Sequence, residues 1–416
     1  MAAPKFQAPR GTFDVLPEAA RVRGRIEQTA AEILARAGYE RIATPSFEDT
    51  ELFERGVGHS TDIVRKEMFT FEDKGGRSLT LRPEGTAPIC RAYVEHGMQA
   101  LAQPVKLAYA GPFFRHERPQ AGRYRQFHQL GAEAIGSDSP LADAELIGLL
   151  AEILAELGVP GVELRLGSLG SFEARQAYLA ELKAHLRAHE GELSREVRER
   201  IDVNPLRAFD SDDEGTQAVM ATAPKLVERL EGEDAEHFAE VRALLDATGV
   251  TYAIDPTLVR GLDYYTRTIF SFVCDRLGAQ SEIGGGGRYD GLVEQLGGKP
   301  TPAVGWAAGI ERIMLALDEE LPAPGRDVFV AVAEEGGERR SLALVLAGEM
   351  RKAGLSAEVD RGGRGLKGQL KHADRVGARR VVILDAEGAQ LRDMSSGEQR
   401  PVEPGNLIEE ITGGEA

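Results

Sequence analysis

The sequence predicts an α+β protein built from two different domains. Its first three quarters contain apolar segments paired across short turns, the pattern of an antiparallel sheet, whereas residues 328–384 follow the order strand, helix, strand, helix, strand. The segment Leu321-Pro322-Ala323-Pro324-Gly325 lies between the two patterns and has the composition of a linker. We therefore expect one domain over residues 1–325 and a small α/β domain over residues 326–416.

The composition is that of a folded protein. The chain has 416 residues, of which 42% are hydrophobic and 28% charged, close to the globular average. No apolar run reaches the roughly 18 residues that a membrane span needs, and the first ten residues lack the apolar core of a signal peptide, so we expect a cytoplasmic protein with no membrane partner. The net charge of −17 argues against a nucleic-acid binder that ignores sequence, although it leaves room for local basic patches.

Local patterns predict the elements of the first domain. A helix over residues 24–37 should end at Gly38, and a short strand over 39–45 should stop at Pro45. Further along we expect a hairpin over 68–82, a second hairpin over 107–130, a helix over 140–157, a mostly helical insertion over about 171–250, and strands at 251 and 268–273. The glycines at 284–287 should lie in turns and at close backbone approaches, and a helix should follow over about 305–317.

The second domain should contain strands over 328–333, 356–359 and 380–384 and helices over 341–353 and 366–376. Its second helix is basic, because Arg364, Lys367, Lys371 and Arg375 stand at offsets of 0, 3, 7 and 11 and so share one helical face. Residues 361–380 hold seven Lys or Arg and one Asp, a net charge of +6. This face indicates a phosphate-rich partner, with an ordinary solvated helix face as the alternative.

Residues 111–127 form an arginine-rich segment in an acidic protein. Four arginines stand within eleven residues, at Arg115, Arg118, Arg123 and Arg125. Guanidinium groups bind phosphate oxygens in pairs, and a strand holds such a side chain stiffly. A solvated, charged hairpin is the alternative, but it fits poorly because Arg115 directly follows Phe113-Phe114 on a strand that should be packed.

Two further arginines stand in distinctive settings. Arg260 lies in Leu258-Val259-Arg260-Gly261-Leu262-Asp263-Tyr264-Tyr265-Thr266, and Arg312 ends Gly309-Ile310-Glu311-Arg312 at an apolar helix. For Arg312 alone, an ion pair on the helix surface with Glu311 or its neighbours is the alternative. The sequence completes neither G-x-G-x-x-G nor a P-loop, and His116, His128 and the two cysteines lie at no zinc-ligand spacing. If a nucleotide binds, arginines must hold its phosphates.

These segments together resemble the bacterial-type histidyl-tRNA synthetases, a family of class II aminoacyl-tRNA synthetases, from end to end. Arg115 with Glu117 resembles class II motif 2, residues 309–312 resemble motif 3, and the helix and strand ending at Pro45 resemble motif 1, which forms the dimer. Residues 258–266 and 284–292 resemble the two histidine-specific segments. The resemblance implies a class II catalytic domain on an antiparallel sheet, with a helical insertion and a C-terminal anticodon-binding domain.

The family activates L-histidine with ATP, releases pyrophosphate and transfers the histidyl group to the terminal adenosine of histidine tRNA. Because the transition state gathers negative charge on phosphoryl oxygens, positioned cations should supply most of the catalysis. The resemblance implies that Arg115 and Arg260 are the catalytic residues, contacting the α-phosphate from opposite sides. It also implies that Arg312 meets the γ-phosphate, that Arg123 assists at the distal phosphates, and that Mg²⁺ bridges the β- and γ-phosphates.

For histidine itself, the resemblance implies a pocket formed by Glu84, Gly85, Thr86, Arg115, Gln129, Glu133, Arg260, Tyr264 and Tyr265. Glu84, Thr86 and Gln129 would take the ammonium group, while Arg115 would hold the carboxylate. Glu133 would accept one imidazole N–H, Tyr265 would meet the other ring nitrogen, and Tyr264 would shape the wall. The residues alone leave two alternatives open: Glu133 in a structural salt bridge and Thr86 as a helix N-cap.

The resemblance also implies a homodimer that binds histidine tRNA. Arg118 and Gln120, at the tip of the motif 2 loop, would read the acceptor end, and Arg364, Lys367 and Lys371 would contact the anticodon stem. The main alternative function is a histidine-binding regulatory subunit of ATP phosphoribosyltransferase, a paralogue that tends to lose the C-terminal module and part of the arginine set. An amino-acid-activating enzyme that needs no tRNA is a further alternative, against which the basic helix argues.

Overall fold

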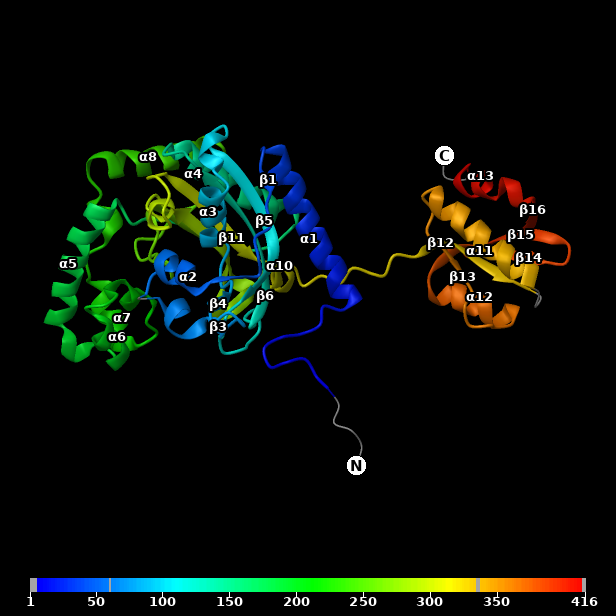
Figure 1. Cartoon of the computed structure of the whole chain (residues 1–416), viewed down its shortest axis with the longest axis horizontal. Coiled ribbons are helices and arrows are strands. Elements are labelled where there is room, and N and C mark those ends of the chain that lie inside the picture. Colours follow the sequence, from blue (N-terminus) through cyan, green and yellow to red (C-terminus); the bar gives the residue numbers. More distant parts are fainter. Residues whose placement is uncertain (1–5, 60, 334–336, 414–416) are drawn as a thin grey trace, which may run out of the picture. The chain divides into compact units, whose positions relative to one another are not determined.

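The computed structural model describes residues 6–59, 61–333 and 337–413. The chain divides into two compact units between Leu321 and Pro322 (Figure 1). The division lies at the start of the expected linker, four residues before the boundary that the sequence suggests. Within the described part of the chain, no helix is long and apolar enough to cross a membrane.

A sheet of eight strands forms the centre of the first unit. In sheet order the strands are β1 (Glu40–Arg41), β5 (Val105–Phe114), β6 (Gln126–Ile135), β11 (Ala303–Gly309), β10 (Glu282–Arg288), β9 (Thr266–Cys274), β7 (Val162–Ser168) and β8 (Ala253–Ile254). Neighbouring strands are antiparallel except at the two ends, where β1 pairs with β5 and β7 pairs with β8 in parallel. The predicted antiparallel α+β architecture is therefore confirmed.

Alternating side chains give the sheet two different faces. On β6, Leu130, Ala132 and Ala134 belong to a large core beneath helices, so Gln129 and Glu133 point to the opposite face. The helices that share this core are α1 (Pro17–Arg36), α4 (Pro140–Glu156), α8 (Gly232–Ala247) and α10 (Ile310–Leu317). Figure 1 shows α1 and α3 (Thr86–Glu95) on opposite sides of the long β5–β6 hairpin.

The opposite face of the sheet carries the smaller elements and the part of the insertion that precedes α8. A three-stranded sheet has the order β2 (Phe47–Asp49), β4 (Ser78–Leu81), β3 (Phe69–Glu72), and the nearby helices are α2 (Thr50–Val57), α3 and α9 (Leu292–Gln295). Between β7 and β8 the chain is mainly helical, as expected, with α5 (Phe172–Ala188), α6 (Arg195–Arg200) and α7 (Glu214–Ala221) preceding α8.

The glycine-rich region differs from the expectation. The glycines at 284–287 lie inside β10 rather than in a turn, although the expected close backbone approach is present: a Cβ added at Gly286 would lie 1.9 Å from the Gly305 carbonyl oxygen. The helix predicted over 305–317 begins only at Ile310, because residues 303–309 form β11. Small residues in a central strand give no periodic apolar pattern, so β10 and β11 could not be predicted from the sequence.

Smaller differences concern the N-terminal elements. Helix α1 begins at Pro17, seven residues earlier than predicted, because a proline is well suited to the first turn of a helix. The expected strand over 39–45 is reduced to Glu40 and Arg41. The hairpin over 68–82 is present as β3 and β4.

The second unit has a five-stranded sheet in the order β13-β12-β14-β15-β16. Its elements along the chain are β12 (Arg326–Val332), α11 (Gly337–Lys352), β13 (Ala357–Val359), α12 (Leu366–Arg375), β14 (Ala378–Asp385), β15 (Gly388–Asp393), β16 (Gln399–Val402) and α13 (Leu407–Thr412). The predicted strand–helix alternation is thus present, with β13 and β14 both parallel to β12. Three short elements, β15, β16 and α13, were not predicted from the sequence.

Candidate active site

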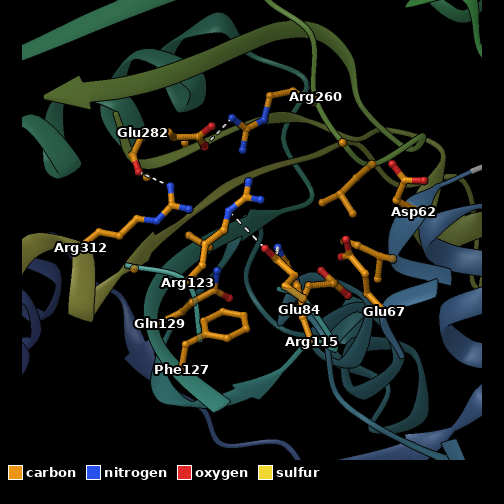
Figure 2. A pocket seen from close by; sticks show the side chains of 18 of the residues that line it. Asp62, Glu67, Glu84, Arg115, Arg123, Phe127, Gln129, Arg260, Glu282 and Arg312 are labelled. Carbon is orange, nitrogen blue, oxygen red and sulfur yellow. Dashed lines mark hydrogen bonds and ion pairs between the residues drawn. The ribbon is translucent and has the colours of Figure 1, made fainter. Parts of the chain in front are cut away.

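One cavity of about 680 Å³ lies on the face of the central sheet that carries Gln129 (Figure 2). Its lining comes from segments far apart in the sequence: the start of α3, the β5–β6 hairpin, the loop before β9, and strands β10 and β11 with the start of α10. The insertion contributes Arg207, Asp210 and Asp212. The cavity is strongly polar, because five arginines and several carboxylates border it.

Arg115 enters the cavity from the end of β5. Its Nε donates to the Pro83 carbonyl over 2.9 Å, and its guanidinium lies 5.3 Å from the centre of the Phe127 ring. The side chain is only 22% exposed. The solvated-hairpin alternative is therefore wrong for Arg115, which is held in place by a backbone acceptor and an aromatic ring.

Arg123 and Arg312 lie at another side of the cavity. Arg123 Nε is 3.2 Å from Glu117 Oε2, and Arg312 donates from Nε to the Gly122 carbonyl over 3.3 Å and from Nη1 to the Glu282 carbonyl. Figure 2 shows the guanidinium groups of Arg123, Arg260 and Arg312 turned toward a common space. Glu311 turns instead to β6, where both carboxylate oxygens accept the His128 backbone N–H at 3.0 and 2.9 Å. The alternative of an Arg312–Glu311 ion pair is therefore wrong.

Arg260 lies against a carboxylate and an aromatic ring. Its Nη1 donates to Glu282 Oε1 over 2.7 Å, and its guanidinium lies 5.7 Å from the centre of the Tyr265 ring. Burial alone would lower the pKa of Arg260, but Glu282 and Tyr265 raise it above its usual range. Burial would likewise raise the pKa of Glu282, yet Arg260, Arg312 and Arg115 lower it. Both groups are thus charged at neutral pH.

Glu84 and Thr86 stand where α3 begins. The Glu84 carboxylate accepts the N–H groups of Thr86 and Ala87 at 2.8 and 3.0 Å, so Glu84 satisfies free donors at the helix N-terminus. Thr86 is the first residue of the helix and its hydroxyl donates to Glu133 over 2.7 Å. The N-cap alternative for Thr86 is therefore wrong.

Glu133 is fully buried just behind the cavity lining. One carboxyl oxygen accepts from Thr86 and the other from the Tyr289 hydroxyl over 2.5 Å. Burial raises its pKa to about 8, even though these two hydroxyls favour the charged form. The partners seen on its oxygens are hydroxyls, so the salt-bridge alternative is not what the structure shows. Gly305 makes room for the group, since a Cβ there would lie 1.6 Å from Glu133 Oε2.

Two tyrosines and a glutamine complete this end of the cavity. Tyr264 and Tyr265 are each 5% exposed, with ring centres 4.7 Å apart, and the Tyr264 hydroxyl lies 3.4 Å from Glu84 Oε2. Gln129 Oε1 is buried with no hydrogen-bond partner among the described residues. A buried acceptor is costly unless something donates to it, so this oxygen indicates a place for a donor on a ligand.

Comparisons with known proteins agree with this arrangement. A family model described as histidyl-tRNA synthetase matches residues 11–313, and one described as an anticodon binding domain matches residues 327–413. The chain belongs to the histidyl-tRNA synthetase family.

Individual relatives cover nearly the whole chain. A histidine–tRNA ligase of Halothermothrix orenii is 47% identical over 97% of this chain and 98% of its own length. The apo histidyl-tRNA synthetase of S. aureus is 36% identical, with a TM-score of 0.82 over 98% of this chain and all of that one. A Bacillus halodurans C protein described as an ATP phosphoribosyltransferase regulatory subunit/histidyl-tRNA synthetase is 24% identical, with a TM-score of 0.67 over 92% of this chain and 98% of that one, and shares the fold.

The predicted tRNA contacts of this family member lie outside the cavity. Arg118 and Gln120 are exposed at the tip of the β5–β6 hairpin. In the second unit, Lys367, Lys371 and Arg375 are exposed on α12. Arg364 precedes that helix and its Nη1 bonds to Asp360 Oδ1 over 2.5 Å, so the expected four-cation helical face is wrong for Arg364.

Several residues of the site were not predicted from the sequence. Glu282 precedes the glycines at 284–287, and no sequence pattern marks it as a site residue. Tyr289 lies in the segment 284–292, which resembles a family segment but gave no role for this residue. Arg207, Asp210 and Asp212 reach the cavity from the insertion, which the sequence suggests only as a helical segment. Only chain folding brings these residues to the arginines, so no local signal was available.

Proposed function

We propose that this chain activates L-histidine with ATP and transfers the histidyl group to the 3′ end of histidine tRNA. A histidine carboxylate oxygen attacks the α-phosphorus of ATP, pyrophosphate leaves, and the terminal adenosine of the tRNA then displaces AMP from the histidyl carbonyl. Family membership supports this activity. The observation that carries it is the convergence of Arg115, Arg123, Arg260 and Arg312 on one cavity beside a buried acidic and aromatic pocket.

The arginines would bind the triphosphate and stabilise the transition state. We propose that Arg115 and Arg260 contact the α-phosphate, Arg312 the γ-phosphate and Arg123 the distal phosphates. Arg115 and Arg312 are held by backbone carbonyls and Arg260 by Glu282 before any substrate arrives. Such preorganised charges need little rearrangement when negative charge develops, which is how electrostatic catalysis works.

The acidic end of the cavity would recognise histidine. Gln129 Oε1 and Glu84, together with Thr86 and Gly85, suit the ammonium group, because the first two supply acceptors within the lining. We propose Glu133 as the acceptor for one imidazole N–H, oriented by Thr86 and Tyr289, and Tyr265 as the partner of the other ring nitrogen. Tyr264 would close the wall against Glu84. Paired polar groups of this kind reject analogues that lack a matching group.

Mg²⁺ would arrive with the nucleotide. The described residues contain no group of three or more His, Cys, Asp or Glu side chains that could hold a metal ion. Mg²⁺ commonly binds through substrate phosphates and water with one or two carboxylates, and the cavity lining offers carboxylates beside the proposed phosphate site. Bound in that way, it would neutralise part of the triphosphate charge.

Partners beyond the small substrates would bind elsewhere. We propose that Arg118 and Gln120 contact the acceptor end of the tRNA, and that Lys367 and Lys371, with a weaker contribution from Arg364, contact the anticodon stem. We also propose a homodimer in the cytoplasm, where tRNA is charged. A monomeric mass in solution at micromolar concentration would contradict the dimer.

The decisive experiment is ATP–pyrophosphate exchange with each of the twenty amino acids. L-histidine alone should support rapid exchange, and histidine tRNA should then be charged. The regulatory-subunit alternative instead predicts that histidine binds without exchange. Exchange with a different amino acid, or histidine binding without exchange in a folded preparation, would rule out the proposed activity.

A further inference from the structure

A half-buried arginine of the insertion contacts the backbone of the histidine-specific loop. Arg175 lies in the first turn of α5, and its Nη1 donates to the carbonyl of Asp263 over 3.2 Å and to the carbonyl of Tyr265 over 2.9 Å. These two carbonyls flank Tyr264. One guanidinium therefore holds the backbone on both sides of a residue that lines the cavity.

The loop needs such support because it has no regular structure. Residues 260–265 belong to neither a helix nor a strand, so their backbone groups must find partners outside a hydrogen-bond ladder. On the other side of the loop, the Asp263 N–H donates to the Val57 carbonyl over 3.2 Å. Asp263 is thus held between α2 and the insertion.

Helix α5 is itself anchored to the sheet. The N–H of its N-cap residue, Ser171, donates to Asp234 over 2.7 Å, and the other oxygen of Asp234 accepts from Arg267 of β9 over 3.2 Å. The start of the helix that carries Arg175 is therefore fixed to the sheet. Hydrogen bonds from a charged donor are stronger than those made by neutral groups.

We propose that Arg175 is a positioning residue that sets the place of Tyr264 and Tyr265 and thereby the affinity for histidine. The insertion then forms part of the amino-acid site instead of serving only as an appendage. This inference rests on the proposed function, because it assigns the tyrosine pair to histidine recognition. It assigns Arg175 no contact with ATP, whose proposed arginines lie elsewhere in the chain.

The test compares three variants in histidine-dependent pyrophosphate exchange. Arg175→Gln removes the charge, Arg175→Lys keeps it with a shorter reach, and Arg187→Gln is the matched control on the same helix, where the side chain is 45% exposed and pairs with Glu190. For Arg175→Gln we expect the KM for histidine to rise about tenfold or more, as loss of charged hydrogen bonds implies. The KM for ATP should change less than about twofold, the control should match the wild type, and Arg175→Lys should recover part of the histidine KM.

The melting temperature of each variant shows whether it is folded, and a histidine titration measures its affinity for histidine directly. An unchanged histidine KM in Arg175→Gln overturns the inference, as does an equal rise of both KM values, which indicates a merely structural role. If Arg175→Gln does not fold, the split between the two KM values must appear in Arg175→Lys, and its absence there overturns the inference. A wild-type chain without histidine-dependent exchange refutes the proposed function instead, so the two failures are distinguishable.

Discussion

At the scale of single residues, the cavity holds its charges in place before substrate binds. Glu282 uses its carboxylate to hold Arg260 and its backbone carbonyl to hold Arg312, so one residue organises two of the proposed phosphate ligands. The Arg260 side chain is 13% exposed and that of Glu282 is 41% exposed. An incoming phosphate therefore meets a guanidinium that is already oriented and largely screened from water.

Replacing Arg260 with alanine should slow histidine-dependent pyrophosphate exchange by at least about a hundredfold, which corresponds to roughly 2.7 kcal/mol of transition-state stabilisation. The measurement is the exchange rate at saturating histidine and ATP. Arg229→Ala serves as the control, because Arg229 is 52% exposed and pairs with Glu181 away from the cavity. Near-normal exchange in the Arg260 variant would refute its catalytic role.

Glu133 should make the stability of the catalytic unit depend on pH. Its pKa is raised to about 8 by burial, against an ordinary value of 4.5, so between these values the folded chain binds a proton that the unfolded chain lacks. The stability that this group contributes is fully present below about pH 4.5 and is lost as the pH rises toward 8. Its share of the slope is at most about 1.4 kcal/mol per pH unit.

The variant Glu133→Gln, neutral at every pH, should therefore flatten the fall in unfolding free energy between pH 5 and 8. Chemical unfolding at several pH values measures this, with Glu240→Gln on the exposed side of α8 as the control. Parallel pH profiles for wild type and Glu133→Gln would show that Glu133 does not titrate in this range.

At the scale of elements, the antiparallel strands position the site and α12 presents the basic surface. The β5–β6 hairpin carries Arg115 and Arg123 near its tip and Gln129 within it, and the glycines of β10 leave space above the sheet. Helix α12 instead exposes Lys367, Lys371 and Arg375. Helix α12 thus offers a basic surface on an element that does not line the cavity.

The double variant Lys367→Gln/Lys371→Gln should weaken tRNA binding without affecting pyrophosphate exchange. Loss of two phosphate contacts should also make the plot of log K against log salt shallower by about 1.4–1.8. A binding titration at several salt concentrations measures both effects. The matched control is Lys74→Gln/Lys352→Gln, which removes the same charge from two other exposed positions. Equal weakening in both variants would mean that net charge, rather than this helix, decides binding.

At the scale of the whole molecule, the two units have separate hydrophobic cores. The core of the second unit lies on the two faces of its own sheet, around Val330 and Leu346 on one face and Phe329 and Ala373 on the other. Neither cluster includes residues of the first unit. Each unit therefore has the apolar contacts that a domain needs to fold.

Deleting residues 326–416 should leave adenylate formation nearly intact and weaken the charging of histidine tRNA. The physical reason is that every residue lining the cavity belongs to the first unit. Pyrophosphate exchange and tRNA aminoacylation, measured on the same preparation, separate the two steps. Unchanged aminoacylation would exclude the second unit as a tRNA contact, and lost exchange would show that the catalytic unit depends on it.

Local patterns determined much of this protein. Periodic apolar residues and turn signals predicted both hairpins, α4, the helical insertion and the alternating second unit, because these features depend on neighbours in the sequence. Unusual clusters, such as Arg115 after two phenylalanines and Arg260 before two tyrosines, predicted the residues that the structure brings to one cavity.

Tertiary structure alone decided the partners of those residues. Several hydrogen bonds join separate parts of the chain, and no local pattern encodes them. They pair Arg260 with Glu282, His128 with Glu311, and two hydroxyl groups with Glu133. Strands β10 and β11 were also identified only in the structure, because close packing of their backbones places them in the sheet and side-chain periodicity does not reveal them. The contact of Arg175 with the backbone at Asp263 and Tyr265 likewise joins distant parts of the chain, so it could not be predicted from the sequence.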